Sequence, residues 1–407
     1  MFELPDLSSV IAGTTMLAFA ATVALAYFSR RLRRNSRDPV TMAIKPVAPV
    51  ETTNLPIENN DPDFRECSAL SQHIADLMTD NEWLEISNKI SAWEARLASS
   101  PGGTRYHEIA VRTCLSGLHG LIDDAPRTAL SDMDAAGVEV SHFEDTHRQS
   151  PDNHILALLA ARAHIALGEA CAADDWPESE RKAAWRQMAQ HFIAAGEILE
   201  PFDAVAHMSP LLAEAHYLCA LGAPGGDSRL WPLFEDWIDL DPSNSGIYDA
   251  HVAALVAHDM LTGDEVLHEA DAALKRTEDT LGFGGYALFF MPLLVEYDSA
   301  RDLVDPELFA AALMDLASMS ATQAEVNDAA ATLLTEMETD DEAVASVYRD
   351  TLILMIRRHL KVIYPRVWPI SVEEIQALVA EAALIVPEID SDEASTFLPT
   401  RHGRLAA

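Results

Sequence analysis

Apolar side chains recur at steps of three and four residues through most of this chain. One such stripe runs through Trp83, Ile86, Ile90, Trp93 and Leu97. The same spacing recurs from Trp185 to Leu199 and from Leu352 to Ile363. This period matches one face of an α-helix, whereas a half-buried strand would alternate apolar and polar residues. We therefore predict an all-α domain over residues 63–386, with roughly fourteen helices of about 10–20 residues joined by short loops.

Three glycines and one aspartate predict where some of these helices begin and end. Gly168, Gly222 and Gly263 stand near the ends of periodic stretches, and glycine is favoured just beyond a helix because it adopts left-handed backbone easily. Asp175 is followed three residues later by Glu178. This pairing is typical of a capped helix start, so we expect Asp175 to cap a helix.

A loose repeat runs through the middle of the chain. The segments FEDTHRQSP, FIAAGEILEP and FEDWIDLDP end at Pro151, Pro201 and Pro242, each with a phenylalanine eight or nine positions before the proline. The stretches that follow the first two prolines both close with Leu-Gly, at residues 167–168 and 221–222.

These segments resemble the tetratricopeptide repeat, in which a first helix ends in Leu-Gly, a second carries an aromatic residue and a proline closes the unit. The residues that match the first helix are Ala160, Ala163, Leu167 and Gly168. Those that match the second helix are Phe192, Ala195, Leu199 and Pro201, with Trp185 on the same stripe and Pro242 closing the next unit. Leu240–Asn244 looks like the usual junction between units. The chain is also similar to membrane-anchored bacterial families of this type whose function is unknown.

The resemblance covers residues 150–300 and implies a right-handed-type solenoid of stacked helical hairpins. One hairpin cannot bury both of its faces, so neighbours stack and offer a long groove to a peptide or helix. The prolines are 50 and 41 residues apart, longer than the standard unit of about 34. The geometry of the groove therefore does not follow from the resemblance.

The N-terminal region holds a 23-residue stretch without charge, from Leu7 to Ser29. A helix that crosses a bilayer needs about 20 such residues. Five arginines follow it directly, Arg30, Arg31, Arg33, Arg34 and Arg37. Basic residues next to a span stay on the cytoplasmic side. We predict a short external N-terminus (1–6), a single transmembrane helix (7–29), a basic flank and Pro-rich linker (30–62), the helical domain, and a flexible tail (387–407).

Two other interpretations of the uncharged stretch stay open. Ala24-Leu25-Ala26 resembles the cleavage site of an export signal, and the stretch could also form a buried or peripheral helix. A signal peptide, however, begins with basic residues. This chain begins with Glu3 and Asp6 and has no Lys or Arg before residue 30. The pattern therefore favours an uncleaved anchor in the inner membrane of a bacterium, with the C-terminal domain in the cytoplasm.

The chain is strongly acidic, with a formal net charge of −37. A field of this sign repels nucleic acids and anionic lipid headgroups. We therefore expect no nucleic-acid binding. An acidic surface keeps a protein soluble, and it also attracts partner proteins that carry basic segments.

No stretch of the chain predicts a catalytic or metal site. The four cysteines form no Cys-x-x-Cys pair, and His142 and His147 are five apart, on different helical faces. Ser179-Glu180-Arg181-Lys182 fits a Ser-x-x-Lys pattern without its companion motifs. The glycines before residues 286–294 lack a phosphate-loop lysine, so this apolar segment is either core or a binding patch. Arg357, Arg358 and Lys361 form a basic cluster expected to pair with acidic neighbours.

The sequence thus predicts a membrane-anchored protein-interaction scaffold, without enzyme activity or cofactor. It would be tied to the membrane through residues 7–29 and would recruit a protein partner at the cytoplasmic face. The alternative is an all-α enzyme or small-molecule sensor with a pocket inside the solenoid. The sequence indicates neither the identity of the partner nor the oligomeric state.

Overall fold

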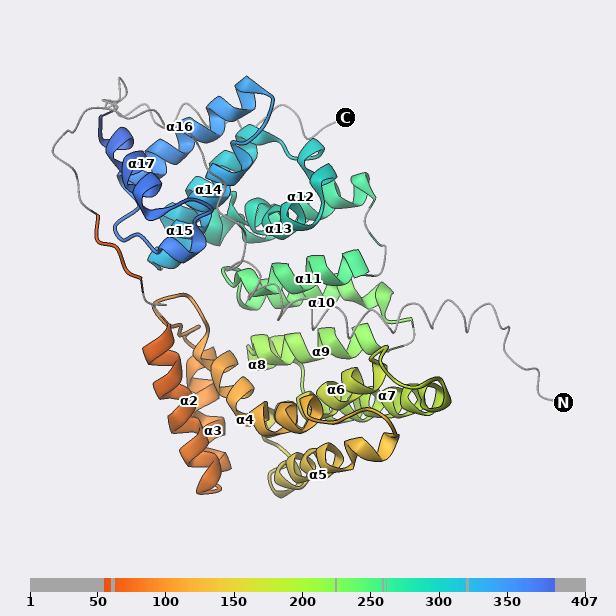
Figure 1. Cartoon of the computed structure of the whole chain (residues 1–407). Coiled ribbons are helices and arrows are strands. Elements are labelled where there is room, and N and C mark those ends of the chain that lie inside the picture. Colours follow the sequence, from red (N-terminus) through yellow and green to blue (C-terminus); the bar gives the residue numbers. More distant parts are fainter. Residues whose placement is uncertain are drawn as a thin grey trace. The chain divides into compact units, whose positions relative to one another are not determined.

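The computed structural model describes residues 55–59, 63–223, 225–257, 260, 262–319 and 322–384 (Figure 1). This part of the chain holds sixteen α-helices, packed largely as sequential pairs. Its only β-type pairings are two isolated bridges, Ile57–Ile363 and Ser99–Arg105. The all-α prediction is confirmed. The estimate of fourteen helices was slightly low, since elements as short as α8 (Ala204–His207) carry no periodic signal.

The described residues fall into two compact units. The first comprises residues 63–100 and 104–262, and the second comprises 101–103 and the chain from 263 onward, together with 55–59. The predicted single domain over 63–386 stays a prediction. The proposed span at 7–29, its arginine flank and the tail at 387–407 lie outside the described residues.

The first unit contains ten α-helices and one short 3-10 helix. They are α2 (Phe64–Thr79), α3 (Trp83–Glu94), α4 (Tyr106–Asp123), η2 (Leu130–Met133), α5 (Asp134–Gln149), α6 (His154–Ala172), α7 (Glu178–Leu199), α8 (Ala204–His207), α9 (Pro210–Gly222), α10 (Asp227–Leu240) and α11 (Ser245–Ala257). Figure 1 shows α6 and α7 side by side, with α9 and then α10 and α11 in successive layers. The central helix α6 packs against α3, α4, α5, α7 and α9.

The buried position of α6 explains its composition. The helix has 19 residues, and its most apolar 18-residue window has a mean hydropathy of 1.5, so it is long and apolar enough for a membrane span, but 83% of that window is buried inside the protein. A core helix meets the same criteria as a membrane helix, so α6 is weak evidence for any span. Asn153 begins the helix by accepting hydrogen bonds from the amides of Ile155 and Leu156.

The second unit contains six α-helices and two short 3-10 helices. They are α12 (Gly263–Leu281), α13 (Gly284–Glu296), η3 (Asp298–Asp302), α14 (Pro306–Met319), α15 (Gln323–Glu336), α16 (Glu342–Arg358), η4 (Pro365–Val367) and α17 (Val372–Leu384). Each α-helix packs against the next along the chain. Thr322 and Glu325 form a capping box at the start of α15. The Glu58 amide donates to the carbonyl of Ile363, and the Ile363 amide donates to the carbonyl of Pro56, both at 2.9 Å.

Three of the four predicted helix boundaries are wrong. Gly168 lies inside α6, which continues to Ala172, because this glycine makes room for a neighbouring ring instead of ending the helix. Asp175 does not cap α7, because its carboxylate pairs with Arg127 at 2.8 Å and Pro177 occupies the cap position. Gly263 begins α12 instead of ending a helix. Gly222 does end α9, as predicted.

Candidate functional site

The residues singled out by the repeat pattern lie mostly in the packed interior of the first unit. Seven of them are buried, namely Ala160, Ala163, Leu167, Gly168, Phe192, Ala195 and Leu199. Trp185 and Pro242 are half-buried, and Pro201 is exposed. The seven buried residues pack in the interior of this unit.

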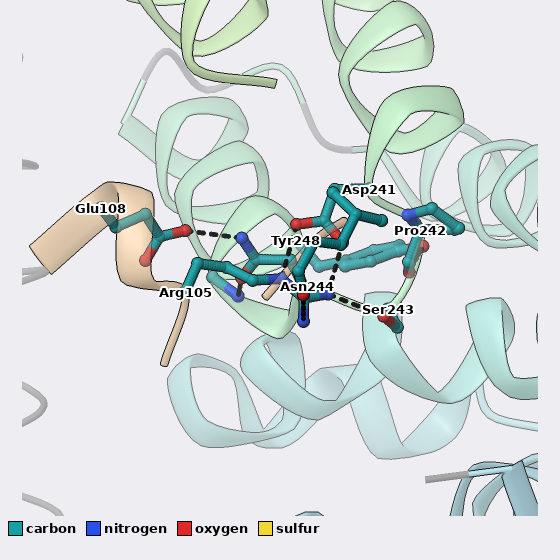
Figure 2. Close-up of polar contacts among 9 residues, drawn as sticks. Arg105, Glu108, Asp241, Pro242, Ser243, Asn244 and Tyr248 are labelled. Carbon is teal, nitrogen blue, oxygen red and sulfur yellow. Dashed lines mark hydrogen bonds and ion pairs between the residues drawn. The ribbon is translucent and has the colours of Figure 1, made fainter. Parts of the chain in front are cut away.

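The junction between α10 and α11 is held against α4 by a buried ion pair (Figure 2). Arg105, directly before α4, donates from Nε to Oδ2 of Asp241 at 2.7 Å and from Nη2 to Oδ1 at 2.5 Å. Asp241 is fully buried. Arg105 also donates to the Ser243 hydroxyl at 2.8 Å. A bidentate pair with further hydrogen bonds satisfies both charges, so this junction is fixed in place.

A second contact beside this pair involves Glu108. Its Oε1 accepts a hydrogen bond from the Asn244 side chain at 2.6 Å, as Figure 2 shows, and the Tyr248 hydroxyl donates to the carbonyl of Pro242 at 2.9 Å. Burial, reinforced by the charge of Glu214, raises the pKa of Glu108 to about 7. The Leu240–Asn244 segment singled out in the sequence is therefore a structural junction that also reaches a titratable carboxyl group.

Glu108 belongs to a larger group of charged side chains, which we call the α4–α6–α9 charge cluster. Its members are Glu108, Arg112 and His119 on α4, Arg162 and Glu169 on α6, and Glu214 on α9. On α4 the successive members Glu108, Arg112 and His119 are four and seven residues apart, and on α6 the two members are seven apart. The members on each helix therefore share one face. Arg162 and Glu214 form an ion pair at 3.1 Å.

The charge cluster contains two carboxyl groups that titrate near neutrality. Burial raises the pKa of Glu169 to about 7, with Arg162 opposing this shift and Glu214 adding to it. Burial, with the charge of Arg162, lowers the pKa of His119. Because the pKa of Glu108 and that of Glu169 are both raised toward neutrality, an arriving cationic group favours the ionised form of these carboxyl groups and is bound by the resulting charge.

The remaining sequence motifs lie outside this cluster. His142 and Ser179 are exposed, as are Arg357, Arg358 and Lys361 near the end of α16. Residues 286–294 lie in α13, where Tyr286, Phe289, Phe290 and Leu293 are all buried, so this segment packs as core. All four cysteines are free. Within the described part of the chain, no group of three or more His, Cys, Asp or Glu side chains is placed to hold a metal ion.

Sequence reasoning missed the charge cluster and the Arg105–Asp241 pair. The two partners of that pair are 136 residues apart, and no local pattern links them. Arg162 and Glu169 do stand out as the only charged residues of the apolar helix α6, and this signal could have directed attention to them.

Comparison with known proteins gives no family for the chain. No protein-family model, no curated protein and no solved structure matches it.

Proposed function

We propose that this protein is a membrane-anchored scaffold. Its acidic, tetratricopeptide-like helical domain would recruit a partner protein at the cytoplasmic face of the bacterial inner membrane. The uncharged stretch at 7–29 and the arginines after it support the anchor and its orientation. The sequential pairing of helices in the described residues supports the repeat architecture.

The observation that carries the recruiting role is the α4–α6–α9 charge cluster. Side chains from three stacked helices meet there, and Glu108, Glu169 and Glu214 are all partly accessible to solvent. Half-buried charges of both signs recognise a charged partner surface specifically, because a mismatched charge against them is strongly unfavourable. The overall charge of −37 also steers basic partner segments toward the domain.

Affinity capture from detergent-solubilised membranes tests this function. The full-length tagged chain should recover a reproducible protein partner. The Arg112→Glu variant reverses an exposed charge in the cluster and should weaken recovery. The matched variant Arg186→Glu, on α7 outside the cluster, should leave recovery unchanged. Equal recovery by both variants would remove the cluster from the proposal, and recovery of no partner by the wild-type chain would overturn the scaffold function.

The membrane anchor needs a separate test. A reporter active only in the cytoplasm, fused after residue 62 of the chain, should be active, and a reporter active only outside the inner membrane should be silent there. The opposite result would place the domain outside the cytoplasm and contradict the proposed orientation.

The alternative function, an all-α enzyme or small-molecule sensor, has one observation in its favour. The pKa of about 7 at both Glu108 and Glu169 suits groups that exchange protons at neutral pH. This alternative predicts that the purified chain carries a bound metabolite that mass spectrometry detects after denaturation, and that no protein partner is captured.

A further inference from the structure

The protein surface is hollowed into a trough between α5 and α7. It lies on the side of α6 that faces away from the charge cluster. Two depressions of about 370 and 410 Å³ lie along it. Leu167 of α6 lines the first depression, and His164 of α6 lies two residues from the cluster residue Arg162. Two residues correspond to about 200° around a helix, so the trough and the cluster use opposite faces of α6.

The residues that line the trough follow one face of each flanking helix. On α5 they include Gly137, Ser141, Glu144 and His147, at steps of three and four. On α7 they include Gln187, His191, Ala194 and Ile198, again at steps of three and four. The two depressions therefore lie along a single path parallel to the helices. The 16 residues of α5 give this path a length of about 24 Å.

A chain of hydrogen bonds joins the two depressions. His164 Nε2 is 2.9 Å from Glu144 Oε1, and His164 Nδ1 is 2.9 Å from His191 Nδ1. These two contacts link Glu144 on α5, His164 on α6 and His191 on α7. Burial, with the neighbouring His164, lowers the pKa of His191 to about 4. His191 is thus neutral at pH 7 and does not offset the charge of Glu144.

The lining carries negative charge and no lysine or arginine. Its ionisable acids are Asp134, Glu144 and Glu197, and burial lowers the pKa of His147, the other histidine on the lining. Apolar surface accompanies these acids. Val138 is 72% exposed at the edge of the first depression, and the half-buried Ile198 lines the second. An apolar path bordered by acids is complementary to a helix with an apolar face and basic flanks.

We propose that the α5–α7 trough is the docking site for a basic amphipathic α-helix of a partner protein. The occupant would lie along the trough with its apolar side chains toward Val138 and Ile198 and its lysines or arginines toward the three acids. This proposal rests on the scaffold function, and it names a second surface and the chemistry of the partner segment.

The probe that tests this proposal is a fluorescent 18-residue peptide of Leu, Lys and Ala with its leucines on one helical face. It is titrated into the full-length chain in detergent. Two controls share its length: one has the same composition in scrambled order, and the other has Glu in place of Lys. The amphipathic basic peptide should bind at least about tenfold more tightly than either control, because only it matches both the apolar path and the charge.

Two variants locate the binding site. A Cβ at Gly137 meets no atom within 4 Å, so Gly137→Trp fills the trough without disturbing the helix and should raise the Kd of the peptide about tenfold or more. Glu197→Lys reverses one lining charge and should raise it about three- to tenfold. The matched variants are Gly117→Trp, also with open space at its Cβ, and Glu82→Lys at an exposed position. Both should stay within about twofold of wild type.

Equal binding by all four variants would show that the peptide adheres to the general acidic surface and would overturn the proposal. Light scattering measures whether the chain associates with itself. If Gly137→Trp self-associates less than wild type but binds the peptide equally well, the occupant of the trough is a second copy of the chain, and the proposal is also overturned. If the wild-type chain and Gly137→Trp capture the same partner equally from membranes, the scaffold function stands and this docking site fails. If the peptide binds in the trough and no partner is captured, the docking site stands and the scaffold function fails.

Discussion

The aromatic ring of Phe192 on α7 lies against Gly222 at the end of α9, so closely that a Cβ on residue 222 would be 2.2 Å from the ring carbon Cε1. The other edge of the ring faces Gly168 on α6, where a Cβ would be 3.1 Å from Cε2. The ring therefore occupies a slot between two glycines on different helices. Both glycines belong to the Leu-Gly pairs that mark the repeat in the sequence.

Gly222→Ala should destabilise the protein by about 1–3 kcal/mol, because the added methyl group overpacks the slot and Gly168 blocks the ring from moving away. Chemical unfolding followed by circular dichroism measures this. The matched variant is Gly120→Ala on α4, where a Cβ meets no atom within 4 Å. That variant should be neutral or more stable by up to about 1 kcal/mol, because alanine favours the helix.

Phe192→Ala should cost about 3–5 kcal/mol through lost burial and the cavity left behind. In this background the same Gly222→Ala change should lose most of its effect, because the atoms that it clashes with are gone. A double-mutant cycle measures this coupling. Additive effects of the two changes would show that the ring and the glycine do not share a slot.

The fold follows from the sequence to the extent that it depends on local periodicity. Helices were predictable because apolar residues at steps of three and four must face one side, and Phe192 was predictable as core because it lies on such a stripe. The Arg105–Asp241 pair was not predictable, since its two charges meet only when α4 packs against the α10–α11 junction. His164 was missed for a related reason: a polar residue in an apolar helix gains a partner only when α5 and α7 supply Glu144 and His191.

Removing Asp241 should be strongly destabilising. Asp241→Ala leaves the buried Arg105 guanidinium without its carboxylate partner, which typically costs about 3–5 kcal/mol. The comparison is Asp145→Ala, which breaks an exposed pair with Arg148 and should cost no more than about 1 kcal/mol. Thermal unfolding of the two variants under the same conditions should separate them clearly. Similar melting temperatures would show that the Arg105–Asp241 pair is not buried in solution.

Asn327 on α15 should be essential for the segment around η4. Its fully buried side chain donates to the carbonyl of Val362 at 2.8 Å and accepts from the Tyr364 amide and the Trp368 indole, both at 2.9 Å. Asn327→Ala removes all three hydrogen bonds, and the loss of the buried bond to the Trp368 indole alone should cost about 1–3 kcal/mol. We expect lower stability and red-shifted tryptophan fluorescence as Trp368 meets water. Asn88→Ala, at an exposed position on α3, should change neither signal.

Glu94 on α3 should make the stability of the first unit depend on pH. The residue is 4% exposed, and its carboxyl oxygen Oε1 accepts hydrogen bonds from the Ser209 hydroxyl at 2.6 Å and the Leu211 amide at 3.2 Å. Burial outweighs these bonds and raises the pKa of Glu94 from 4.5 to about 7. Between these two values the folded chain keeps a proton that the unfolded chain loses, so stability falls as pH rises through this range and is constant above it.

The Glu94→Gln variant isolates this effect, because glutamine keeps the accepting oxygen and does not titrate. The free energy of unfolding of the variant relative to wild type should increase between pH 5 and pH 8, by up to about 3 kcal/mol at 1.36 kcal/mol per pKa unit. All other titrating groups are common to both proteins and cancel in this difference. Any cost of the amide itself does not depend on pH, so it shifts the difference by a constant and leaves its pH dependence unchanged. The matched variant is Glu82→Gln, at the exposed position directly before α3, and its free energy of unfolding relative to wild type over the same pH range gives the baseline. A flat profile for Glu94→Gln would mean that Glu94 is ionised in the folded protein at pH 5, and that water reaches this carboxyl group.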